Sequence, residues 1–75
     1  NSSVQFLITG TSAGVLQIDI FSVLGEKVDH FNVGAITDDQ KLVGWTPPVN
    51  ISSGTYFVNA ASGTVRSTLK ILYIK

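Results

Sequence analysis

The sequence predicts an all-β, antiparallel two-layer sandwich, and three observations lead to that fold class. Apolar and polar side chains alternate along most segments, as they do in strands that have one dry face. Turn-forming residues recur about every 8 to 12 positions, which is the spacing typical of an antiparallel sandwich. No stretch has the period of about 3.6 residues that marks a helix, so we expect neither a helical nor a mixed fold.

Length and composition allow one small domain, residues 1–75, with a modest core. A chain of 75 residues buries roughly 60% of the surface that its unfolded form exposes. Hydrophobic residues make up 44% of the chain and charged residues 13%, which excludes a disordered protein. The formal net charge of +0 disfavours nucleic-acid binding, and no apolar run is long enough for membrane insertion. Because the chain contains no Met, we expect it to be a piece of a longer protein.

The first half of the chain predicts one strand followed by a tight hairpin. Residues 4–8 alternate as a strand, and the small residues of 10–14 form a loop. The hairpin starts at about residue 15 and turns at Leu24 and Gly25. Its second strand is expected to run over residues 26–33 and to end where Gly34 opens a break.

The second strand of this hairpin has an irregular phase. Val28 does not alternate in step with Phe31 and Val33. A β-bulge near Asp29 and His30 would explain this, because one extra residue switches the side that faces inward.

The second half of the chain predicts three more strands. Residues 37–40 form a polar turn and 41–45 a short strand, after which Pro47 and Pro48 make residues 46–50 an extended connection or a sheet edge. Residues 55–61 and 65–74 follow as strands, separated by a turn at 62–64. The inward faces of these two strands are expected to carry Tyr56, Val58, Ala60, Val65, Leu69, Ile71 and Tyr73.

The chain offers little for catalysis or for a cofactor. It has no cysteine, and its only histidine, His30, lies beside Asp29 on a strand, where neighbouring side chains point to opposite faces. The carboxylates lack the spacing of a calcium loop, and no glycine group matches a phosphate loop or a nucleophile elbow. We therefore expect no metal, no cofactor and no enzyme activity, and we interpret His30 as an ordinary surface residue.

The aromatic side chains allow two interpretations. A sugar-stacking platform would use Trp45, Tyr56, Phe57 and Tyr73. The stronger interpretation is that aromatic rings fill the core of a small two-sheet domain, with Trp45 as a plug at the sandwich edge.

Five apolar residues fall on the outward-facing parity of their strands: Leu7, Phe21, Phe57, Leu72 and Ile74. If they adjoin, they form an apolar patch that marks a contact with the preceding domain of a parent protein or with a secretion component. The alternative, which we prefer for any single residue, is that loops cover them or that strands bulge. The exposure of Phe21 and Phe57 distinguishes the two, because full burial removes the patch.

Three segments together resemble a known family. Residues 20–28 resemble the I-Y-N-x-x-G-x-x-V hairpin of the C-terminal sorting domain of the type IX secretion system, 53–58 its G-x-Y-x-V block, and 70–75 its K-x-x-x-x-K terminus. Residues 4–8 fit the family's first strand, although the usual upstream Asn-Pro pair is missing. The related immunoglobulin-like domain of the flagellar hook-capping protein shares the hairpin, and Trp45 is closer to the W-x-G of that relative. The resemblance implies a small immunoglobulin-like antiparallel β-sandwich of about seven strands.

The resemblance also implies a non-catalytic sorting signal at the end of a larger exported protein. The type IX translocon would recognise the folded domain in the periplasm and export the cargo, and a sortase-like peptidase would then attach the cargo to lipopolysaccharide at the cell surface. The positions that the resemblance singles out are Gly25, Gly54, Tyr56, Lys70 and Lys75. The glycines and the tyrosine would serve folding, and the terminal strand with its lysines would serve recognition.

Two other functions remain open. A structural immunoglobulin-like module would pack against an adjacent catalytic domain, and failure to export a reporter would favour it. A carbohydrate-binding module would need exposed coplanar aromatic rings, and silence on a glycan array would dismiss it.

Overall fold

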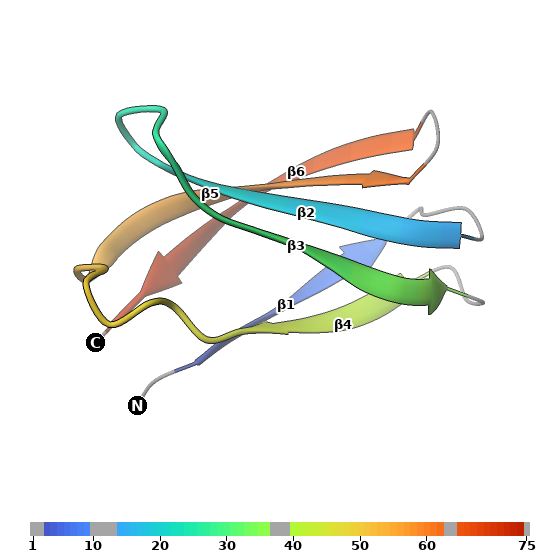
Figure 1. Ribbon diagram of the computed structural model, residues 1–75, viewed down its shortest axis with the longest axis horizontal. Helices are drawn as coiled ribbons and strands as arrows, with labels where there is room; N and C mark the ends of the chain where they lie inside the picture. Colours follow the sequence, from blue (N-terminus) through green and yellow to red (C-terminus); the bar gives the residue numbers. More distant parts are fainter. Residues whose placement is uncertain (1–2, 10–13, 37–39, 63–64, 75) are drawn as a thin grey trace.

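The computed structural model describes residues 3–9, 14–36, 40–62 and 65–74, and all regular elements within them are β-strands (Figure 1). In chain order they are β1 (Val4–Thr9), β2 (Gly14–Ser22), β3 (Lys27–Ile36), β4 (Gln40–Trp45), β5 (Gly54–Ser62) and β6 (Val65–Tyr73). The predicted all-β class is confirmed. Most of the loop predicted at residues 10–14 and of the turns predicted at 37–40 and 62–64 lies outside the described residues, as does Lys75. The end residues that are described were assigned wrongly, because Gly14, Gln40 and Ser62 belong to strands β2, β4 and β5.

The strands form two antiparallel sheets that enclose one core. β1 pairs with β4, and the second sheet has the order β3-β2-β5-β6. Figure 1 shows β1 and β4 as a separate layer from β2 and β3. The described residues contain six strands, whereas the family resemblance implies about seven. Residues 46–50 form a connection, the first of the two alternatives predicted for them. Pro47 and Pro48 have no N–H to donate to a ladder, and the Ile51 N–H donates to the Pro48 carbonyl at 3.0 Å in a turn.

The hairpin between β2 and β3 turns where the sequence predicts it. The Ser22 N–H donates to the Glu26 carbonyl at 2.9 Å, and the Gly25 N–H donates to the Ser22 carbonyl at 3.0 Å. The Ser22 hydroxyl oxygen accepts from the backbone N–H groups of Leu24 and Glu26. Gly25 has a φ of +87°, a left-handed conformation that side chains with a Cβ rarely adopt, which explains a glycine at this position.

A β-bulge lies at Val28, one residue before the predicted position. Ile20 is opposite Asp29, whereas Phe21 is opposite Lys27, so Val28 is the extra residue on β3. The bulge restores the phase of the strand, because Phe31 and Val33 then pack against the core.

β3 is longer than predicted. The expectation that it ends at about Val33 was wrong, because the strand continues to Ile36 and pairs there with Gly14. A second register shift, between Gly14 and Leu16 of β2, allows the ladder to pass Gly34 without ending.

The core lies where the two sheets face each other, and its residues alternate along the strands as predicted. The buried hydrophobic residues are Phe6, Ile8, Leu16, Ile18, Ile20, Val43, Trp45, Tyr56, Val58, Ala60, Ile71 and Tyr73. Trp45 lies at the centre of an aromatic group: its ring centroid is 5.8 Å from Tyr56 in an edge-to-face arrangement and 6.2 Å from Tyr73. The interpretation of these three rings as core residues is confirmed.

Candidate functional site

The outer face of the four-stranded sheet is the candidate functional surface. Residues directly opposite each other on paired strands share a face, so the registers align side chains from all four strands into rows. The first row contains Lys27, Phe21, Phe57 and Lys70. The second contains His30, Asp19, Asn59 and Thr68, and the third contains Asn32, Gln17, Ala61 and Arg66.

The first row places two aromatic rings between two lysines. Phe21 and Phe57 are directly opposite each other, and Phe57 is 36% exposed while Phe21 is half-buried. The ammonium group of Lys27 lies 5.9 Å from the centroid of the Phe21 ring, within the range of a cation–π interaction. Neither phenylalanine is fully buried, so their exposure does not rule out the predicted apolar patch.

The predicted patch nevertheless divides between the two faces of the sandwich. Leu72 lies on the same outer face as Phe57, because Lys70 is directly opposite Phe57 and Leu72 is two residues further along β6. Ile74 follows β6 and is exposed. Leu7 lies on the other sheet, where it pairs with Leu42 and faces solvent. Leu7 is therefore separate from the other residues of the patch.

The second row is joined by polar contacts. His30 Nδ1–H donates to Asp19 Oδ1 at 2.6 Å, and Lys27 Nζ lies 3.5 Å from the same oxygen. The hydrogen bond from His30, followed by the charge of Lys27, lowers the pKa of Asp19, and these effects exceed the opposing effect of its partial burial. On the other half of the row, the Thr68 hydroxyl donates to Asn59 Oδ1 at 2.8 Å.

The His30 ring contacts Asp19 and not the carboxylate of its sequence neighbour Asp29. As predicted, Asp29 and His30 point to opposite faces: the Asp29 carboxylate accepts the indole N–H of Trp45 in the core, and His30 faces Asp19 on the surface. Within the described residues, His and carboxylate side chains form no group of three or more that could hold a metal ion. Sequence reasoning missed the Asp19–His30 contact, because only the bulge at Val28 sets the register that brings these strands' side chains together.

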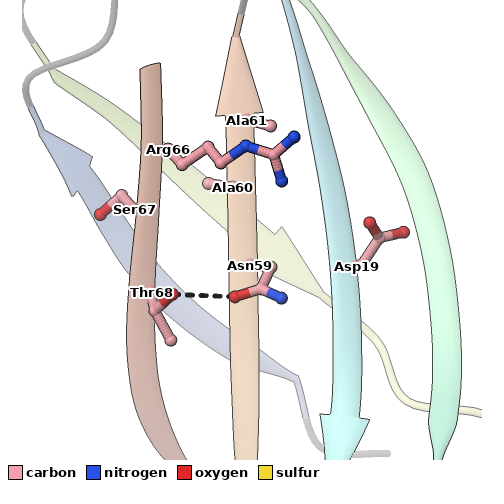
Figure 2. A pocket seen from close by; sticks show the side chains of 7 residues that line it. All are labelled: Asp19, Asn59, Ala60, Ala61, Arg66, Ser67 and Thr68. Carbon is pink, nitrogen blue, oxygen red and sulfur yellow. Dashed lines mark hydrogen bonds between the residues drawn. The ribbon is translucent and has the colours of Figure 1, made fainter. Parts of the chain in front are cut away.

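A depression of about 120 Å³ lies beside the second row (Figure 2). Its lining residues are Asp19, Asn59, Ala60, Ala61, Arg66, Ser67 and Thr68. The methyl group of Ala61 stands between larger neighbours, Gln17 on β2 and Arg66 on β6, so the surface is hollowed at this point. Figure 2 shows the Arg66 side chain extending over β5 toward β2, and the amide nitrogen of Asn59 on the side that faces Asp19. From the sequence only Ala60 among these residues is predicted to face inward, and none of them is predicted to belong to a site, because Ala61 becomes distinctive only beside its cross-strand neighbours.

The positions singled out by the sequence resemblance are dispersed over one end of the large sheet. Gly25 lies in the hairpin turn, and Gly54 begins β5 with a φ of +152°, which residues with a Cβ rarely adopt. Tyr56 is buried, and its hydroxyl donates to the Ser52 carbonyl at 2.6 Å. Lys70 is exposed in the first row, and Lys75 lies outside the described residues.

The sugar-stacking platform expected as an alternative is not available as proposed. Trp45, Tyr56 and Tyr73 are 2%, 6% and 4% exposed, so a ligand cannot reach the faces of these rings. Phe57 alone of that group lies on the surface, where its neighbour across the strands is Phe21.

Comparison of the chain with protein-family models, with curated proteins and with solved structures gives no match. In the part of the chain that the structure describes, no helix is long and apolar enough to cross a membrane.

Proposed function

We propose that this chain is a non-catalytic, immunoglobulin-like sorting and anchoring module that directs a larger cargo protein through the type IX secretion system. The module would pass the periplasm with its cargo and reach the cell surface or the extracellular space. Its partners would be the preceding domain of the parent protein, the outer-membrane translocon and a sortase-like peptidase. The module would be a substrate of that peptidase and would bind neither nucleic acid nor the membrane directly.

The strand order supports the immunoglobulin-like part of the proposal. In a variable-type immunoglobulin sandwich, strands G, F, C and C′ are neighbours in one sheet, and strands B and E are neighbours in the other. The order β6-β5-β2-β3, with β1 and β4 in the second sheet, corresponds to this arrangement.

Tyr56 gives independent support for the same fold. Immunoglobulin-like sandwiches contain a tyrosine near the start of strand F whose hydroxyl bonds to the backbone a few residues upstream. Tyr56 lies near the start of β5, the strand that corresponds to F, and its hydroxyl donates to the carbonyl of Ser52. The contact between the tyrosine of the G-x-Y-x-V block and the Ser52 carbonyl therefore supports the proposed immunoglobulin-like fold.

The accessibility of β6 is the observation that carries the sorting role. Among the described strands β6 pairs only with β5, so the backbone groups along its other edge are free of a strand partner. Ile71 and Tyr73 point into the core, whereas Lys70 and Leu72 are exposed. An edge strand with one anchored face and one open face can be recognised by an added strand or by pockets for its exposed side chains.

Export of a reporter tests this proposal. We expect residues 1–75, fused to the end of a periplasmic reporter in a bacterium that has the type IX system, to bring the reporter to the cell surface. Replacing Lys70 by Gln should reduce export, because Lys70 lies on the strand to be recognised. Lys27→Gln is the matched control, since Lys27 stands at the other end of the same row, on β3. Unfolding midpoints of both variants must match the parent, and equal export of the two variants would contradict recognition through β6.

A structural module that packs against a neighbouring domain is the second candidate, and one observation favours it. Leu7 and Leu42 are paired on the outer face of the two-stranded sheet and are 45% and 58% exposed. An apolar pair of this kind gains stability when another domain covers it. Absence of surface export from the fusion, combined with a well-folded domain, would favour this role.

A further inference from the structure

Cationic side chains outnumber carboxylates on the outer face of the four-stranded sheet, although the sequence as a whole is neutral. Lys27, Arg66 and Lys70 all lie in the rows on the outer face of the four-stranded sheet, and Asp19 is the only carboxylate in those rows. Asp29 points into the core instead. The outer face is therefore cationic, and a ligand that complements it carries negative charge.

The depression beside the second row has hydrogen-bond donors that face outward. Asp19 forms an ion pair with Lys27 and a hydrogen bond with His30, and neither contact involves Arg66. Asn59 accepts from Thr68 through Oδ1, which leaves its amide nitrogen able to donate into the depression (Figure 2). A guanidinium and an amide thus flank the Ala61 floor, opposite the Asp19 carboxylate.

These groups complement a ligand that has both a carboxylate and hydroxyl groups. A guanidinium binds a carboxylate through two parallel hydrogen bonds. Asn59 can donate to a hydroxyl oxygen, and Asp19 can accept from a hydroxyl hydrogen. Phe57 is two residues before Asn59 on the same face of β5, roughly 7 Å away, and its exposed ring offers an apolar surface to the carbon face of a sugar ring.

We propose that this face binds an acidic polysaccharide, with the carboxylate of one uronate unit on Arg66 and hydroxyl groups on Asn59 and Asp19. The depression lies on the outer face of the sheet, in line with the exposed Phe57 ring and the exposed Lys70, so a segment of a longer chain can extend from it along the same face. A polyanion without hydroxyl groups would leave Asp19 facing negative charge, so acidic peptides are disfavoured. This role goes beyond the proposed export function and does not depend on it.

Titration of the ¹⁵N-labelled 75-residue chain with trigalacturonate tests the proposal. We expect amide shifts at Asn59, Ala61, Arg66 and Thr68, and no comparable shifts with the methyl-esterified trisaccharide, which has the same ring hydroxyls but no charge. Arg66→Gln should weaken binding about tenfold, because one charge-assisted hydrogen-bond pair is lost. Lys41→Gln, a change of equal charge on β4 of the other sheet, should leave binding unchanged.

Three results would overturn the proposal. The first is the absence of shifts with trigalacturonate, and the second is equal binding by the Arg66→Gln variant and the parent. The third is equally tight binding of an oligoglutamate of matched charge, which would mean that the face recognises carboxylates without the sugar.

Discussion

Trp45 and Asp29 join the two sheets through a partly buried hydrogen bond. The indole Nε1–H of Trp45 on β4 donates to Asp29 Oδ2 on β3 at 2.6 Å. Trp45 is 2% exposed, so its N–H has no access to bulk water, and the second carboxylate oxygen of Asp29 accepts the His30 backbone N–H at 2.8 Å. The bulge at Val28 makes this contact possible, because it sets the register in which Asp29 lies opposite buried Ile20.

Loss of this carboxylate should destabilise the domain. Asp29→Ala leaves the indole N–H buried without an acceptor, and we expect the free energy of unfolding in urea to fall by about 1–3 kcal/mol. Asp29→Asn keeps an acceptor oxygen and should cost less. A double-mutant cycle with Trp45→Phe isolates the pair, and a coupling energy near zero would show that the contact contributes nothing.

Tyr56→Phe removes only a hydroxyl group and tests the contact with Ser52. The hydroxyl holds the turn that precedes β5, and without it the partly buried carbonyl of Ser52 loses its donor. We expect a loss of about 1–2 kcal/mol in unfolding free energy, with little change in the slope against denaturant. Tyr73→Phe is the matched control, because Tyr73 is also buried and contacts Trp45 from β6. Equal costs for the two variants would contradict a special role for Tyr56.

Gly25→Ala tests the turn of the central hairpin. No atom lies within 4 Å of a Cβ built at Gly25, so any cost comes from its φ of +87° and not from a clash. We expect the unfolding free energy to fall by about 1–2 kcal/mol. Gly44→Ala is the control: the space around it is equally open and its φ is outside the left-handed region, so the change should be within about 0.5 kcal/mol. A cost at Gly44 as large as at Gly25 would refute conformational strain as the cause.

The strands and much of the core could be predicted because their signal is local. Alternation with a period of two identifies Ile18 and Ile20, or Tyr56 and Val58, as inward-facing whatever the strand pairs with. The turn at Gly25 could be predicted for the same reason, since glycine between two alternating segments marks a hairpin.

Contacts between distant strands could not be predicted in this way. β4 pairs with β1 and not with its neighbours in the chain. The alternation of apolar and polar residues in a strand does not identify the strand with which it pairs. The candidate site has the same origin: Asn59 meets Thr68 through one hairpin register, and Asp19 meets Asn59 through the pairing of β2 with β5. Sequence alternation places these side chains on a face, but the registers decide which of them are neighbours.

The contact between His30 and Asp19 should make stability depend on pH in the acid range. The pKa of Asp19 is lowered from its ordinary value of 3.8, first by the hydrogen bond from His30 and then by the charge of Lys27. A depressed carboxyl pKa stabilises the folded state above the unfolded pKa, and this contribution is lost as the pH falls through the folded pKa. We expect the unfolding free energy to decrease between about pH 5 and about pH 2, and we expect His30→Gln to reduce that decrease.

Because Asp19 is 30% exposed, the effect on the unfolding free energy should be small, so the comparison is made at low salt. Asp19→Asn is the control variant that lacks the titrating group. Identical slopes in this range for the parent chain, His30→Gln and Asp19→Asn would show that the contact does not contribute to stability.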